Sequence, residues 1–297
     1  LRRPDGRRAC AGDQQPEPIL HDHHRGGIFV LNPDRLRDIN VEAFTDLLLN
    51  GTELEPWSFA VLSGVAFLGA FITVALGLGG GILVLAAMAL ILTPTVLIPI
   101  HGVVQLGSNV GRFALLARHS LFEILPVFLI GTLLGVAVGG HLVFALPIPL
   151  LQLILALFIL YSTWAPRFKA SNPGKKAFFG VGVLSTIATM FVGATGPLVM
   201  PFVAAACPDR QQVVATHAML MTIQHGLKLI TFGFLGFAFG PYVPFLAALL
   251  AFGFAGTYLG KLALNRLPEK AFRISLKTIL TVMAIHLLYE AVTAYLA

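Results

Sequence analysis

The sequence predicts an all-α, polytopic membrane protein that consists of two inverted repeats of about five helical segments each. Three observations lead to this fold class: the composition, a series of apolar segments and an internal repeat. The chain of 297 residues is 57% hydrophobic and 11% charged, and its mean hydropathy is +0.84. These values are far from those of a soluble domain. The lipid bilayer is therefore expected to surround most of the chain.

The apolar segments begin at Trp57 and are separated by glycine, proline or basic loops. They cover residues 57–78, 80–93, 95–117, 122–145, 149–165, 176–194, 196–206, 211–234, 241–264 and 271–296. A transmembrane helix needs about 20 apolar residues, and the segments 80–93 and 196–206 are shorter than that. Each of these two follows a glycine-rich break, GLGGG (77–81) or GATGP (193–197). Short, glycine-interrupted helices at matching places in two halves are typical of transporters.

An internal repeat relates the two halves of the apolar region. A shift of 116 positions superposes glycine, threonine and histidine residues, namely Gly64 on Gly180, Thr73 on Thr189, Gly77 on Gly193, Gly80 on Gly196 and His101 on His217. In the third segment of each half, the same shift superposes polar residues, namely Ser108 on Gln224, Asn109 on His225 and Arg112 on Lys228. We therefore interpret the chain as a duplication.

The positions of lysine and arginine predict how the segments cross the membrane. Basic residues follow the third, fifth, seventh and ninth segments, whereas the loops near residues 94, 147 and 238 carry no charge. Because cytoplasmic loops are enriched in lysine and arginine, equivalent loops of the two halves face opposite sides. This makes the repeat inverted and places the N-terminus outside.

These features divide the chain into four parts. They are a polar N-terminal segment (1–55), membrane repeat 1 (56–166), a basic cytoplasmic linker (167–175) and membrane repeat 2 (176–297). The first part begins with Leu1 and contains HDHH, and we interpret it as partly disordered or as a mis-called start. From Asn32 its sequence is compatible with a short amphipathic helix on the membrane surface.

The distribution of charge favours an anionic substrate over nucleic acid. All but four acidic residues precede Trp57, so the apolar region is basic. The basic residues stand between apolar segments rather than on one face, which is the pattern of cytoplasmic loops and not of a nucleic-acid-binding surface. The two cysteines have no metal-binding spacing, and there is no P-loop. We therefore expect no cofactor, and the sequence leaves open whether the chain forms a homo-oligomer.

The two breaks are candidate anion sites. A helix that begins inside the membrane has unpaired N–H groups at its first turn, and its dipole favours negative charge there. Glycine also lets a ligand approach the backbone closely. The candidate residues in the breaks are Gly77, Gly79, Gly80, Gly81, Gly193, Thr195 and Gly196. Close helix packing is the alternative explanation for each single glycine.

A polar face on the third segment of each half supplies further candidates. In THAMLMTIQHGLK (216–228), the two histidines, a glutamine and the lysine recur on one helical face. We place His101, His217, Gln105, Asn109, Gln224 and His225 on the substrate pathway, with interhelical hydrogen bonds as the alternative role. Arg112 and Lys228 lie near the far ends of their helices, where their side chains either snorkel to the interface or form a cationic vestibule.

Two other functions remain as alternatives. His217, Met221 and His225 are spaced four residues apart and could bind a soft metal cation. A non-transporting membrane subunit is the second alternative. The apolar region contains no pair of acidic residues, no Ser/His/Asp set and no HExxH motif, so we do not expect an enzyme.

At GLGGGILVL, GATGPLVMP and VVATHAML the sequence resembles the sulfite exporter TauE/SafE family, over about residues 57–297. The resemblance implies a multi-pass carrier in a bacterial inner membrane that exports sulfite or small organosulfur anions. It also implies that the family's glycine-rich motifs correspond to GLGGG and GATGP here. Thr195 and His217 depart from the family pattern, which would place a glycine and a small hydroxyl residue there. A subgroup with a different anion or a proton-linked mechanism is therefore an alternative to sulfite export.

Overall fold

The computed structural model describes residues 48–49, 52, 54–76, 79–143, 146–165, 170–263 and 269–296. The chain divides into two units, of which the second, Ala43–Ala297, contains every described residue. HDHH and most of the expected amphipathic helix lie outside the described residues. The division of the chain into four parts stays a prediction.

The second unit is built from α-helices, and each predicted apolar segment corresponds to one of them. The helices are α2 (Pro56–Leu76), α3 (Gly80–Ala89), α4 (Pro94–Leu116), α5 (Leu125–Val143), α6 (Ile148–Trp164), α7 (Lys175–Val192), α8 (Gly196–Ala206), α9 (Arg210–Phe234), α10 (Val243–Ala263) and α11 (Glu269–Leu296). Three short 3-10 helices lie between them: η1 (Ala117–His119), η2 (Phe122–Ile124) and η3 (Gly240–Tyr242). The described residues contain no strand, so the all-α membrane fold class is confirmed.

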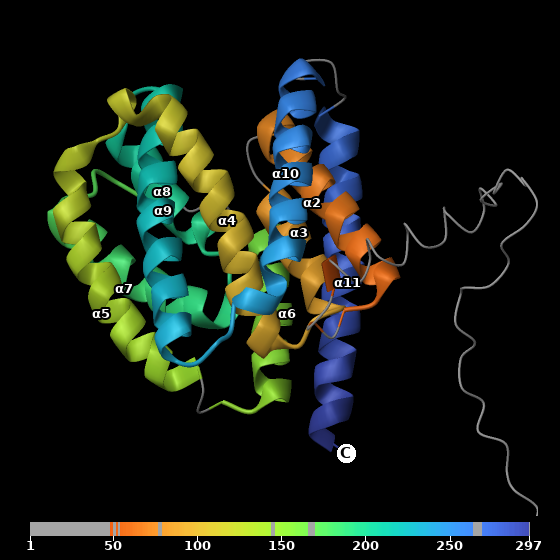
Figure 1. The fold of residues 1–297 in the computed structure, drawn as a ribbon. Coiled ribbons are helices and arrows are strands. Elements are labelled where there is room, and N and C mark those ends of the chain that lie inside the picture. The colour runs from red at the N-terminus through yellow and green to blue at the C-terminus, as the bar shows by residue number, and fades with distance from the viewer. Residues whose placement is uncertain are drawn as a thin grey trace, which may run out of the picture. The chain divides into compact units, whose positions relative to one another are not determined.

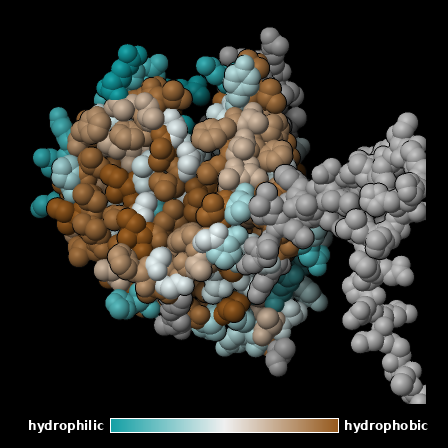
Figure 2. All heavy atoms as spheres, viewed as in Figure 1, coloured by the Kyte–Doolittle hydropathy of each residue, from teal (hydrophilic) through white to brown (hydrophobic). Residues whose placement is uncertain are grey.

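Five helices of the described part are long and apolar enough to cross a membrane: α2, α5, α7, α10 and α11. Helices α3, α6 and α8 are apolar but shorter. Large hydrophobic side chains such as Leu184 and Val282 are exposed on the outside, and Figure 2 shows mainly hydrophobic residues across the middle of the surface with hydrophilic residues toward its ends. This is the surface that a bilayer covers.

Helices α4 and α9 are the exception, because each carries the polar face described above. The two helices pack against each other, as Figure 1 shows. Polar side chains are costly when they face lipid, so such helices are stable in a membrane when their polar faces are turned toward protein. The pairing of α4 with α9 therefore brings the candidate pathway residues of both halves into the interior.

The helix pairs follow the duplication. Helix α2 of the first half packs against α10 of the second half. The equivalent helices, α7 of the second half and α5 of the first, pack against each other in the same way. The fifth helices of the two halves, α6 and α11, form a further pair. Figure 1 shows α5 beside α7 at one side of the unit and α2 beside α10 at the other. Each half is thus covered by helices of the other half, which makes the two repeats one structural unit.

The contacts of glycines give the directions of the helices. Gly256 and Gly260 of α10 lie against Phe67 and Phe71 of α2, so these two helices are parallel. Gly107 and Gly111 of α4 lie against Leu250 and Phe254 of α10, so α4 is parallel to both. The chain therefore returns across the unit through the short helix α3, between α2 and α4.

Helices α4 and α9 are antiparallel. Gly102 near the start of α4 lies against Lys228 and Leu229 near the end of α9. Beyond the end of α4, the amide of Leu121 donates a 2.9 Å hydrogen bond to Oγ1 of Thr216 near the start of α9. Opposite directions of equivalent helices are what an inverted repeat requires. The inverted relation of the complete halves stays a prediction.

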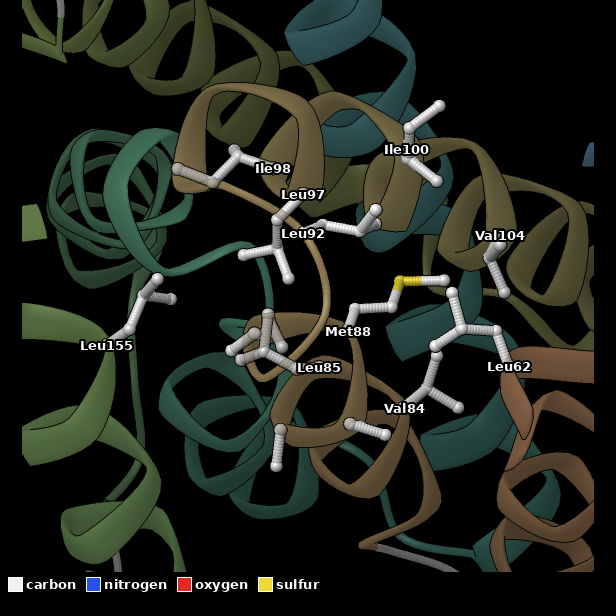
Figure 3. Packing of buried hydrophobic residues seen from close by; sticks show 14 of the residues in the cluster. Leu62, Val84, Leu85, Met88, Leu92, Leu97, Ile98, Ile100, Val104 and Leu155 are labelled. Atoms are coloured by element: carbon white, nitrogen blue, oxygen red, sulfur yellow. The ribbon is translucent and has the colours of Figure 1, made fainter. Parts of the chain in front are cut away.

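The two short helices are buried to different extents. Nine residues of α3 are buried, and α3 packs against α2, α4, α6 and α11. In α8 only Val199 and Val203 are buried, and its main contacts are with α9 and α7. Figure 3 shows Leu85 and Met88 of α3 in a cluster with Leu97 and Ile100 of α4. The core of the unit is therefore centred on the first break rather than midway between the halves.

Candidate functional site

Two buried histidines lie against the glycine-rich breaks, one in each half. On α4, Nε2 of His101 is 3.1 Å from the carbonyl oxygen of Gly81, and on α9, Nε2 of His217 is 3.2 Å from the carbonyl oxygen of Gly196. A carbonyl oxygen only accepts, so Nε2 is the protonated nitrogen of each ring. Gln105 also lies against Gly81, where an added Cβ would be 2.8 Å from its Nε2 atom. Each histidine therefore lies against the break of its own half.

His101 also faces the break of the other half. Gly193, at the end of α7, has a φ of +76°, and a Cβ added to it would lie 3.2 Å from Nδ1 of His101. A larger side chain would contact His101, and the positive φ is strained for any residue other than glycine. Nδ1 is buried and has no hydrogen-bond partner among the described residues. Protonation of Nδ1 would make it a donor, at the cost of a second positive charge beside Lys228.

Lys228 is the most deeply buried cation in this region. Its side chain is completely inaccessible to solvent, and Nζ lies 3.3 Å from the carbonyl oxygen of Gly193. The methylene chain passes Gly102, where an added Cβ would be 2.7 Å from Cε. Within the described residues Lys228 forms no salt bridge. The side chain of Lys228 is therefore buried and does not reach the surface as snorkelling would require. Its role as a vestibule residue stays a prediction.

Arg112, the counterpart of Lys228, is bound to its own helix. Its Nε donates to the carbonyl oxygen of Ser108 over 3.2 Å, and Nη2 donates to Oδ1 of Asn109 over 2.9 Å. Asn109 is buried, and its Nδ2 donates to the carbonyl oxygen of Gln105 over 2.7 Å. Arg112 itself is half-buried. Asn109 therefore orients the guanidinium, and Arg112 keeps the position expected of a vestibule residue.

The cations and histidines of the two halves alternate along the antiparallel pair α4 and α9. Lys228 of the second half interacts electrostatically with His101 of the first, and Arg112 of the first half with His217 of the second. His225 interacts with all four of these side chains, and its buried Nδ1 has no hydrogen-bond partner among the described residues. Lys228 thus lies at the His101 end of the pair and Arg112 at the His217 end, with His225 between them, and neither half alone contains all five basic side chains.

Gln224 makes the interhelical hydrogen bonds that were the alternative to a pathway role. Its Oε1 accepts a 3.0 Å hydrogen bond from Oγ1 of Thr195, and its Nε2 donates to Oγ of Ser185 and Oγ1 of Thr186 over 2.8 and 2.9 Å. All of these side chains are buried. The two N–H groups of the amide are both used, so Gln224 connects α7, α9 and the second break and has no donor left for a ligand. Sequence reasoning missed Ser185 and Thr186, although adjacent hydroxyl residues in an apolar helix were a visible signal.

The glycines of the first break serve packing as well as backbone geometry. Gly79 caps α3 with a φ of +102°, which favours glycine. Gly80 lies against the backbone of Gly69 and the hydroxyl of Thr73, so no ligand fits between them. Gly77 lies outside the described residues. Close helix packing is therefore the better explanation for Gly80.

The second break is built differently, which explains the threonine in it. Thr195 occupies the position equivalent to Gly79, but its φ is −104°, an angle that any residue adopts. At the first turn of α8, Pro197 has no N–H group and the N–H of Leu198 donates to the carbonyl oxygen of Thr195 over 2.9 Å. The start of α8 therefore offers few backbone donors to an anion. Side chains are the main donors of the site.

A soft-metal site receives no support from the described residues. Met221 is buried in an apolar cluster with Val199 and Val203, and Nε2 of His217 is engaged with Gly196. The part of the chain that the structure describes contains no group of three or more His, Cys, Asp and Glu residues that could hold a metal ion. The alternative of a site at His217, Met221 and His225 therefore lacks a set of free ligands.

Comparison with known proteins gives one match. The model of the family described as "Sulfite exporter TauE/SafE" matches residues 62–287. This range includes both breaks, α4, α9 and all five basic side chains of the site. No curated protein and no solved structure matches the chain.

Proposed function

The chain belongs to the sulfite exporter TauE/SafE family, and we propose that it is a secondary transporter that moves a small anion, sulfite or an organosulfur anion, across a bacterial inner membrane. The family and the apolar helices make it a membrane transporter. Membership in a family of exporters also favours transport over catalysis. The proposal adds the class of substrate, the site that binds it and the mode of transport.

The buried side-chain nitrogen of Lys228, which has no acidic partner among the described residues, is the observation that carries the proposal. An isolated charge is expensive to bury unless another group compensates it. Among the described residues, Nζ donates one hydrogen bond, to a backbone carbonyl oxygen, whereas an ammonium group has three donors. A small anion that enters beside Gly193 would supply the missing negative charge and accept the remaining N–H groups.

The histidines beside Lys228 suit the same ligand. Nδ1 of His101 and Nδ1 of His225 are buried and lack hydrogen-bond partners in the described part of the chain. A histidine that gains a proton there becomes a second donor to the anion. Because protonation also adds a positive charge, it would strengthen anion binding. This arrangement supports coupling of anion movement to a proton.

The antiparallel helices suit alternating access. The site lies between α4 and α9, so it changes when one half rocks against the other. The two halves differ in the structure, since α3 is enclosed by four helices and α8 is not. We propose that during transport α8 takes the enclosed environment and α3 takes the more open one.

Transport of sulfite into proteoliposomes tests the proposal with three variants of the full chain. Lys228→Gln removes the buried charge, Lys228→Arg keeps it, and Lys261→Gln removes a charge from an exposed position on α10. We expect Lys228→Gln to abolish transport, Lys261→Gln to transport as the wild type does, and Lys228→Arg to retain part of the activity. Equal transport by Lys228→Gln and Lys261→Gln would contradict the proposed site.

A further inference from the structure

A hydrogen bond between the two halves lies at the end of the unit that the charge pattern places in the cytoplasm. Figure 1 shows the end of α4 and the start of α9 at the same end of the unit, and η1 packs against α9 there. The amide of Leu121, in the first half, donates to Oγ1 of Thr216, in the second half, over 2.9 Å. Thr216 is completely buried. This hydrogen bond therefore joins the halves inside a closed contact.

An apolar cluster surrounds the hydrogen bond. Cys207 and Met221 of the second half are buried in this cluster, and Phe113 and Leu121 of the first half pack against it. The thiol of Cys207 donates to Oγ1 of Thr216 over 3.7 Å. The hydrogen bond and the cluster together close the cytoplasmic end between the halves.

The closed contact leaves buried polar atoms without partners. Nδ1 of His119, Oγ of Ser120 and Oε1 of Gln212 are buried and have no hydrogen-bond partner among the described residues. Ser120 precedes Leu121 in the chain, and Gln212 precedes Thr216 by about one helical turn. Such atoms make the closed arrangement less favourable, and they regain hydrogen bonds when water reaches them. Opening of this end therefore exchanges one hydrogen bond between the halves for the hydration of three atoms.

The equivalent stretch of the repeat has a different environment at the other end of the unit. The shift of 116 positions superposes Ser120 on Gly236 and Leu121 on Phe237. Gly236 and Phe237 follow α9 and border a cavity of about 390 Å³. The same stretch is thus fastened against a helix in one half and borders a cavity in the other half.

We propose that the hydrogen bond between Leu121 and Thr216 is the latch of a cytoplasmic gate, formed by residues 117–124 and the start of α9, and that opening of this gate exposes Cys207. This inference rests on the proposed alternating access of the transporter. It adds the place where the pathway is closed on the cytoplasmic side and the contact that must break.

The rate at which Cys207 reacts with a membrane-impermeant maleimide tests the proposal in inside-out membrane vesicles. The full chain carries Cys10→Ser, which leaves Cys207 as its only cysteine. Leu121→Pro removes the donor of the latch and keeps Thr216 beside the thiol. Proline suits this backbone, because φ of Leu121 is −80° and Ser120 is extended. Leu121→Ala is the matched control, since it also removes the leucine side chain but keeps the amide.

We expect Cys207 to react about two- to tenfold faster in Leu121→Pro than in Leu121→Ala, which is the effect of one hydrogen bond on the equilibrium between the closed and open gate. A melting curve of each variant separates gate opening from unfolding. A second pair of variants changes the acceptor instead of the donor. Thr216→Val removes the hydroxyl and should react faster than Thr216→Ser, which keeps it.

The outcomes separate the latch from the proposed function. Equal rates within both pairs of variants would overturn the latch. A faster reaction of Leu121→Pro in right-side-out vesicles than in inside-out vesicles would overturn the cytoplasmic position of the gate. Absence of sulfite transport by the wild type would contradict the proposed function, whereas a faster reaction of Leu121→Pro than of Leu121→Ala would still support the latch.

Discussion

Replacement of Gly102 by alanine tests whether the position of Lys228 matters for anion binding. The new Cβ would lie 2.7 Å from Cε and 3.1 Å from Nζ of Lys228, and 2.9 Å from Cδ2 of Leu229. These distances are too short for unshifted atoms, so the ends of both side chains must move. The substitution therefore displaces the ammonium group without removing its charge.

The expected cost in stability is small. Overpacking a core costs about 1–3 kcal/mol, and the lower end applies because the contacted atoms are ends of flexible side chains. Alanine in place of glycine inside a helix returns about 0.5–1 kcal/mol. The net destabilisation is then at most about 0.5 kcal/mol, which lowers the melting temperature of a unit of this size by at most about 2 °C.

The expected loss of affinity is larger. A hydrogen bond to a charged group contributes about 1.5–3 kcal/mol, and losing one at Nζ would weaken anion binding by roughly ten- to a hundredfold. Calorimetric titration with sulfite, together with a melting curve for the same sample, measures both quantities. Gly226→Ala on α9 is the matched control, because no atom lies within 4 Å of its added Cβ. Wild-type affinity in Gly102→Ala, or an equal loss in Gly226→Ala, would refute this reasoning.

Three further predictions concern the polar residues around the site. Gln224→Leu removes three buried hydrogen bonds and leaves the Thr195 hydroxyl without its acceptor. We expect thermal unfolding to show a destabilisation of about 2–4 kcal/mol. The control Gln211→Leu, at an exposed position, should show no measurable change. Thr195→Gly should destabilise the protein by about 1–2 kcal/mol. The φ of Thr195 is negative, so glycine relieves no backbone strain there, and the hydrogen bond to Gln224 is lost. A gain in stability would contradict this prediction. Arg112→Gln should reduce transport less than Lys228→Gln in the same proteoliposomes, since Arg112 is half-buried and bound to its own helix; the reverse order would place the anion at the Arg112 end of α4.

The sequence was sufficient for the fold because hydropathy and the repeat are visible in one dimension. Ten apolar segments became ten helices in the described part of the chain, and the short ones began at the breaks. The repeat also identified α4 and α9 as equivalent polar helices. The structure shows that these two helices pair and are antiparallel, and the pairing keeps their polar faces away from lipid.

The roles of single residues were harder to predict, because they depend on the partner helix. Position near a helix end made snorkelling the natural interpretation for Lys228, but the antiparallel partner places Gly102 and Gly193 beside it. Gln224 could not be distinguished from a pathway residue until Ser185 and Thr186 of α7 were found next to it. The repeat predicted equal halves, whereas α3 and α8 differ in burial. Such contacts between helices cannot be inferred from the spacing or the composition of the sequence.

Thermal stabilisation of the purified protein by sulfur oxyanions is the most direct measurement of the central claim, which is that an anion binds between the halves at Lys228. A ligand at about 100 times its dissociation constant adds roughly 2.7 kcal/mol to the stability of the folded state. We predict that sulfite or a small sulfonate stabilises the wild type and Lys261→Gln by this order, and that neither stabilises Lys228→Gln. Equal stabilisation of all three proteins would contradict the claim.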